Sequence, residues 1–178
     1  MNKKLSNEPP KNLSKNSDCS GNSGKKLAPG DKAPDFVLPD DAGARISLAG
    51  FAGRKLVLYF YPKDDTSGCT KEAIEFNGLR GEFKKARAEI LGVSPDPVAS
   101  HAKFKAKHKL KLVLASDESK AMLEAYGVWV EKSMYGRKYM GIERTTFVIG
   151  KDGKIAAVWN QVKVPGHAEA VLAAVKAL

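Results

Sequence analysis

Hydrophobic and polar positions divide the chain into a polar N-terminal segment and a domain whose apolar residues recur at strand and helix spacing. Lys55–Tyr61 is almost continuously apolar and aromatic over the length of one strand, which predicts a central strand covered on both faces. From Thr70 to Arg87, apolar residues recur every three or four positions, which predicts a helix with one buried stripe. Thr145–Ile149 and Ile155–Trp159 flank a turn rich in Gly and Asp, and this arrangement predicts a β-hairpin.

Weaker signals complete an alternating order of elements. The order β, α, β, α, β, α, β, β, α predicts an α/β sandwich around a central mixed sheet, with one parallel half and one hairpin half. Asp117 is the expected N-cap of the third helix. The additional segments are an extended stretch and turn over residues 33–48, strands over 90–93 and 112–115, and helices over 98–108, 117–126 and 167–178.

The N-terminal segment differs from the domain in composition. Residues 1–27 are rich in Asn, Ser, Lys and Gly and hold almost no large apolar side chain, so burial cannot offset the entropy cost of ordering them. We expect a disordered basic tail over residues 1–27 and one domain over residues 28–178. The chain has no run of about 18 apolar residues and no secretory signal, so we expect no membrane partner and a cytoplasmic location. Organellar targeting by the basic, Ser-rich tail is the alternative.

The net charge of +10 raises the question of a nucleic-acid partner. Residues 1–33 contain seven Lys and three acidic residues, a net +4, which leaves +6 for the rest of the chain. The densest basic run, residues 103–111, lacks the interleaved aromatic residues that stack on bases, so we interpret it as a solvated helix face and expect no specific nucleic-acid partner. The three histidines, His101, His108 and His167, are scattered and are expected on the surface rather than as ligands.

The number and spacing of the cysteines limit which kinds of cysteine site the chain can form. The chain has two cysteines, Cys19 and Cys69, which form neither a disulfide framework nor a zinc spacing and fit a reducing compartment. Cys69 follows the predicted central strand and a short loop, in the first turn of the predicted helix. Orphan N–H groups and the helix dipole stabilise a thiolate at such a position, whereas an inert buried cysteine is the alternative.

The residues around this cysteine carry a family resemblance. Pro62, Thr66 and Cys69 have the spacing Pro-x-x-x-Thr-x-x-Cys, and residues 59–73 resemble the peroxiredoxin family, in particular its bacterioferritin-comigratory or peroxiredoxin Q subfamily. Residues 30–36 and 139–147 are similar to two further motifs of that subfamily. The resemblance covers residues 27–178. It implies a thioredoxin-like fold ending in a β-hairpin and a helix, and a cofactor-free peroxidase that reduces hydrogen peroxide and organic hydroperoxides.

The resemblance also implies roles for individual residues. Cys69 would attack the peroxide and become a sulfenic acid. Thr66 would present its hydroxyl to the peroxide and to the sulfur, with the backbone N–H of Cys69 as a second donor. Pro62 would shield the thiolate from water. Arg144 would hold the thiolate ionised and polarise the departing oxygen, the alternative being a surface Arg paired with Glu143.

The sequence departs from the family at the resolving thiol. Many members carry a cysteine five residues after the reactive one, where this chain has Ile74, and the residue before Gly68, usually Pro, is Ser67. We therefore expect a one-Cys cycle with an external reductant such as thioredoxin, glutaredoxin or glutathione. Cys19 is a candidate resolving thiol carried on the tail.

Two other functions compete with the peroxidase. A thiol-disulfide oxidoreductase would need a second cysteine where Thr66 stands. A redox sensor or chaperone-like binding module would turn peroxide over slowly. We expect a monomer or weak dimer.

Overall fold

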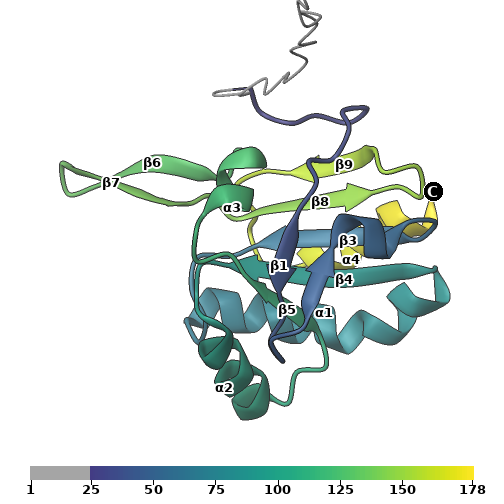
Figure 1. The fold of residues 1–178 in the computed structure, drawn as a ribbon, viewed down its shortest axis with the longest axis horizontal. Helices are drawn as coiled ribbons and strands as arrows, with labels where there is room; N and C mark the ends of the chain where they lie inside the picture. Colours follow the sequence, from purple (N-terminus) through teal and green to yellow (C-terminus); the bar gives the residue numbers. More distant parts are fainter. Residues whose placement is uncertain (1–24) are drawn as a thin grey trace, which may run out of the picture.

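The computed structural model describes residues 25–178 and is built around a five-stranded mixed sheet in the order β5-β4-β3-β8-β9 (Figure 1). β3, β4 and β5 run parallel, and β8 and β9 add the antiparallel half as a hairpin. This is the predicted arrangement, with the first half wound through crossover helices and the second half closed by a short turn. The strands of the sheet are β3 (Lys55–Phe60), β4 (Ala88–Ser94), β5 (Val113–Ser116), β8 (Thr145–Ile149) and β9 (Ile155–Trp159).

The central strand β3 is fully buried because both faces of the sheet are covered. Its alternate side chains enter two separate apolar clusters, as the period of a strand requires. Val57 and Tyr59 face the cluster that contains side chains of α1 (Ser67–Lys85), α2 (Val98–His108) and α4 (His167–Lys176). Leu56, Leu58 and Phe60 face the second cluster, which is closed by α3 (Ala121–Ala125), β1 (Val37–Pro39) and part of β2 (Arg45–Ser47).

The bounds of the predicted helices and of the strands of the central sheet agree with the structure to within three residues, except at the third helix. The predicted bounds of α2, β8 and β9 are confirmed. The prediction that Asp117 caps a helix starting there is wrong, because α3 begins at Ala121 after Lys120 adopts a left-handed conformation (φ 65°). Asp117 instead accepts a hydrogen bond from the backbone N–H of Leu123 at 2.9 Å.

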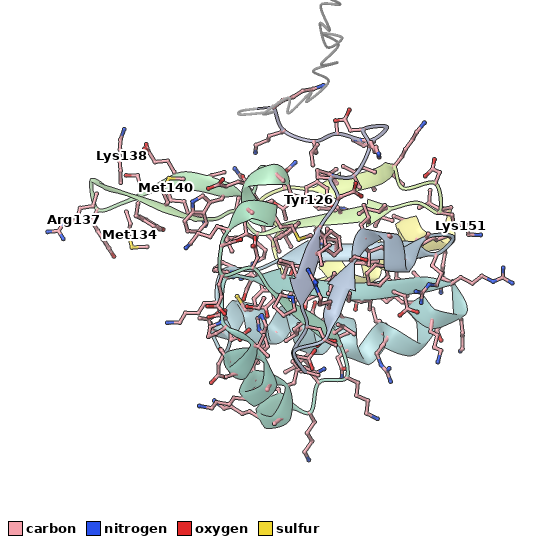
Figure 2. All side chains as sticks on the ribbon, in the orientation of Figure 1. Tyr126, Met134, Arg137, Lys138, Met140 and Lys151 are labelled. Atoms are coloured by element: carbon pink, nitrogen blue, oxygen red, sulfur yellow. The ribbon has the colours of Figure 1, made fainter. Side chains whose placement is uncertain are left out.

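A second hairpin was missed by the sequence analysis. β6 (Trp129–Met134) pairs with β7 (Arg137–Ile142) in a separate two-stranded sheet that extends away from the body of the molecule (Figure 1). Met134 and Met140 are about half exposed, and Figure 2 shows their side chains on this projection. The apolar alternation that identifies a half-buried strand is weak here, because most of the hairpin has no core to face.

The start of the described chain contacts the domain. Leu27 packs against the second apolar cluster, and Lys26 Nζ lies 3.0 Å from Glu143 Oε2. The prediction of a disordered tail applies mostly to residues 1–24, which lie outside the described part of the chain, and so does the prediction for Cys19. Within residues 25–178, no helix is long and apolar enough to cross a membrane.

Candidate active site

The N-terminus of α1 presents free backbone donors at Cys69. Thr66 occupies the N-cap position with extended backbone angles, and the first turn is closed by the N–H of Thr70, which donates to the Thr66 carbonyl at 2.8 Å. The N–H groups of Ser67, Gly68 and Cys69 therefore precede the first helical hydrogen bond. The Thr66 side chain makes no capping bond, so the positive end of the helix dipole is left to other acceptors.

Arg144 lies beside the sulfur of Cys69. Its Nη2 donates to Cys69 Sγ at 3.3 Å, and the cysteine residue is only 2 % exposed. Burial opposes the charge of the guanidinium, but Glu72 and Cys69 outweigh it and raise the pKa of Arg144 above its usual value. A permanent cation and a helix N-terminus thus converge on one sulfur, the two conditions that favour a thiolate.

Gly68 makes the approach of Arg144 possible. A Cβ atom at this position would lie 3.1 Å from Arg144 Nη2, tighter than an ordinary contact. The sequence analysis treated Gly68 only as part of the loop motif. Its role depends on a residue 76 positions later in the chain, so no local pattern could identify it.

Glu72 is a site residue that the sequence analysis did not single out. Its carboxylate Oε2 pairs with Arg144 Nη1, and the residue is 1 % exposed. Burial raises the pKa of Glu72 to about 7, although Arg144 opposes that shift. Glu72 lies three residues after Cys69 on one helix face, beside the buried Ala73, and a carboxylate on an apolar stripe was the available signal.

The backbone of Arg144 is held from two sides. Its carbonyl accepts the N–H of Val162 at 3.0 Å, from the segment between β9 and α4. The next residue, Thr145, starts the buried strand β8. Glu143, the alternative partner for Arg144 in the sequence analysis, pairs with Lys26 instead.

The two predicted residues of the loop before α1 are more exposed than Cys69. Pro62 is half-buried, and Thr66 is exposed. The Thr66 hydroxyl donates to the Lys63 carbonyl at 3.0 Å rather than to the sulfur, so its lone pairs are left as acceptors. Arg144 is therefore the predicted residue that contacts Cys69 directly.

The prediction that the histidines lie on the surface is wrong for two of the three. His101 is fully buried and His167 is 7 % exposed, whereas His108 is half-buried beside Asp65. His167 Nε2 lies 2.8 Å from Thr146 Oγ1, and burial lowers the pKa of His167 to about 4. Each buried ring has a hydrogen-bond partner on a distant element, which sequence spacing does not reveal.

Comparison with known proteins identifies the family. Residues 29–158 match the model of the AhpC/TSA family. The chain belongs to this peroxiredoxin family. It is 50 % identical over 143 residues to a putative peroxiredoxin Bcp of Coxiella burnetii, covering 80 % of this chain and 95 % of that protein. It is 45 % identical over 147 residues to peroxiredoxin Bcp of Bacillus subtilis, covering 83 % and 94 %.

Solved structures support the same assignment. The bacterioferritin comigratory protein of Xanthomonas campestris, studied for its alkyl peroxide reduction activity, superposes with a TM-score of 0.77 at 48 % identity, covering 80 % of this chain and 90 % of that one. A peroxiredoxin Q mutant of Xylella fastidiosa gives a TM-score of 0.82 at 42 % identity, covering 86 % and 98 %. The predicted thioredoxin-like fold is confirmed, and the chain is a thiol peroxidase of the Bcp/peroxiredoxin Q type.

Proposed function

We propose that Cys69 is the peroxidatic residue and that Arg144 keeps it ionised. The observation that carries this assignment is the 3.3 Å contact between Arg144 Nη2 and Cys69 Sγ at the start of α1. The thiolate attacks the terminal oxygen of a hydroperoxide, an S–O bond forms, and the O–O bond breaks. The departing oxygen takes up a proton and leaves as water or alcohol, while Cys69 becomes a sulfenic acid.

The residues around the sulfur stabilise the transition state. The guanidinium of Arg144 and the free N–H groups of the first turn of α1 can donate to both peroxide oxygens as negative charge moves to the departing one. The Thr66 hydroxyl, already donating to Lys63, accepts the proton-bearing end of the substrate. Pro62 limits the access of water. Hydrogen peroxide and organic hydroperoxides are the substrates, a range supported by the alkyl peroxide activity studied in the relative from Xanthomonas campestris.

The sulfenic acid is reduced by an external thiol. Cys69 is the single free cysteine within residues 25–178. Ile74 occupies the helical position of one common resolving cysteine, and α2, the helix in which other members carry it, contains no cysteine. A first thiol displaces water and forms a mixed disulfide, and a second thiol releases Cys69 with formation of an external disulfide. Thioredoxin, glutaredoxin and glutathione are the candidate classes.

Cys19 is the candidate for an internal resolving thiol. It stands seven residues before Lys26, whose ammonium is paired with Glu143, the neighbour of Arg144. Seven extended residues span about 25 Å, so a tail that leaves the domain at Lys26, the partner of Glu143, is long enough to approach Cys69. Non-reducing electrophoresis and mass mapping after one equivalent of peroxide test this role, and a Cys19 that stays free while Cys69 is oxidised excludes it.

The quaternary state and compartment complete the proposal. The cytoplasm is the proposed compartment, because its thiols are kept reduced and Cys69 must be reduced between turnovers. The proposed quaternary state is a monomer, with weak dimerisation at most. Light scattering over a hundredfold concentration range and fractionation of cells test these two statements.

The decisive experiment is turnover with matched variants. Peroxide consumption is measured in the presence of excess dithiothreitol for the wild type, Cys69→Ser and Cys19→Ser. The wild type should turn over, Cys69→Ser should be inactive, and Cys19→Ser should keep most of the activity. Turnover by Cys69→Ser, or none by the wild type, would contradict the proposal.

A further inference from the structure

The loop that carries Pro62 and Thr66 is anchored through the buried side chain of Asp64. Asp64 Oδ1 accepts the hydroxyl of Tyr61 at 2.7 Å, and Oδ2 accepts the hydroxyl of Ser100 at 2.7 Å. A third contact joins Oδ2 to Nδ1 of His101 on α2 at 2.8 Å. Burial raises the pKa of Asp64, but the hydrogen bonds from His101, Tyr61 and Ser100 outweigh it and keep that pKa below its usual value. Asp64 is therefore an anion in the interior.

The surroundings of His101 require a doubly protonated ring. His101 is fully buried, and its second nitrogen, Nε2, lies 3.1 Å from the carbonyl oxygen of Ala115 on β5. A carboxylate and a carbonyl have no proton to give, so both ring nitrogens must donate. The Tyr61 hydroxyl lies 3.3 Å from Nδ1 but donates its proton to Asp64, so it does not donate to the ring. The geometry thus describes a buried imidazolium–carboxylate pair between the loop and α2.

Neighbouring contacts fix the same loop to the sheet. The N–H of Asp64 donates to Asp96 Oδ2 at 2.9 Å, and Asp96 also accepts the hydroxyl of Ser94 at the end of β4. Asp65, in a left-handed conformation at φ 58°, pairs with Lys107 at 2.6 Å and with His108 at 2.8 Å. The polar groups around the His101 ring are Ser100, Tyr61, Asp64 and the carbonyl of Ala115. Of these, Asp64 is the one charged group, so the pair of His101 and Asp64 is the buried ion pair of this region.

We propose that His101 is a positioning residue for the peroxidase reaction, whose imidazolium holds Asp64 and thereby the segment Pro62–Thr66 that leads into Cys69 at the start of α1. The inference rests on the proposed function of Cys69. His101 contacts neither the sulfur nor the peroxide, and it acts through the loop. Without the imidazolium, Asp64 keeps only the hydroxyl donors of Tyr61 and Ser100, and the loop loosens. Loss of the pair should therefore slow the reaction with peroxide and leave the reactivity of the sulfur itself unchanged.

His101→Gln is the direct test, in a Cys19→Ser background. The second-order rate of sulfenic acid formation with hydrogen peroxide should fall about tenfold, which corresponds to roughly one misplaced interaction in the transition state. The alkylation rate of Cys69 by iodoacetamide should stay within twofold, because Arg144 and the helix N-terminus are unchanged.

A double-mutant cycle shows that the effect passes through the pair. Asp64→Asn should lower the peroxide rate as much as His101→Gln, and the double variant should lose no more than either, since the two changes remove one interaction. Ser100→Ala removes a single donor to Asp64 and should give a smaller loss of two- to threefold. This variant keeps the test open if His101→Gln does not fold.

Phe83→Leu is the control for a purely structural effect. Phe83 is fully buried in the apolar cluster that also contains Cys69. It lies fourteen residues beyond Cys69 on α1, which is about 21 Å along the helix. The substitution should lower the melting temperature without changing the peroxide rate. The inference is overturned if His101→Gln leaves the peroxide rate unchanged or slows alkylation as much as the peroxide reaction, or if Phe83→Leu loses rate in proportion to stability. A wild-type Cys69 unreactive toward peroxide would instead refute the proposed function itself.

Discussion

Replacement of Glu72 by Gln tests the electrostatics of the site. Glu72 Oε2 and the sulfur of Cys69 contact the two terminal nitrogens of the same guanidinium, so one cation serves two anions. Gln removes the negative charge but keeps an oxygen that can accept from Arg144 Nη1. We expect the thiolate of Cys69 to become easier to form.

The size of the effect follows from the geometry. Two anions on opposite arms of one guanidinium are roughly 6 Å apart, and at an effective dielectric constant of about 20 they repel by roughly 3 kcal/mol. That energy corresponds to about two pH units in the titration of the sulfur. Because the pKa of Glu72 is about 7, its carboxylate is ionised about half of the time at neutral pH. The shift of the Cys69 alkylation profile is therefore expected toward lower pH and is smaller than this limit, because Glu72 takes up its proton as pH falls through about 7.

The assay is the pH dependence of iodoacetamide alkylation at Cys69, followed by mass spectrometry in a Cys19→Ser background. Glu75→Gln is the matched control, because it removes the same charge one helical turn further from the sulfur and should change the alkylation profile much less. An unchanged or raised midpoint in Glu72→Gln would refute the reasoning. That result would mean that the charge of Glu72 is needed to orient Arg144.

Three further changes test other parts of the structure. Arg144→Ala should lower the second-order rate with hydrogen peroxide by about a hundredfold or more, with partial recovery in Arg144→Lys, measured by stopped flow; a loss below threefold would exclude its role. The contribution of Glu72 to the unfolding free energy should fall by on the order of 3 kcal/mol as pH rises from 4.5 to 7, because folded Glu72 retains its proton there. His167 acts with the opposite sign as pH rises from 4 to 6.5, so the difference between wild type and Glu72→Gln in urea titrations isolates Glu72, and parallel curves would contradict its raised pKa. Gly92→Ala should destabilise the fold by about 1–3 kcal/mol, because the new Cβ would lie 2.7 Å from the ring and hydroxyl of Tyr59, and a neutral effect in urea unfolding would show that the ring can move.

Local patterns in the sequence predicted most of the central sheet and the helices that cover it. The continuous apolar run of β3 and the helical stripe of α1 are strong because each is set by burial against many neighbours. The hairpin β6–β7 was missed because its strands have little core to face. The third helix was started too early because Lys120 in a left-handed conformation, rather than the Asp117 side chain, precedes its first turn.

The site could be predicted only in part for a related reason. Cys69 and Arg144 were found through the family resemblance, and the structure brings them together. Glu72 and Gly68 act through Arg144, a contact between residues more than seventy positions apart, and no local spacing encodes it. His101 was placed on the surface because an isolated histidine carries no sequence sign of the carboxylate and carbonyl that enclose it.

The central claim is that Cys69 exists as a reactive thiolate in the folded protein at neutral pH. The most direct measurement is the rate of Cys69 alkylation at pH 7 relative to its high-pH plateau, in native Cys19→Ser protein and after unfolding in urea. The account predicts a native rate close to the plateau at pH 7 and a strong decrease of that fraction on unfolding. A native sulfur that is alkylated only well above neutral pH, as in the unfolded chain, would contradict it.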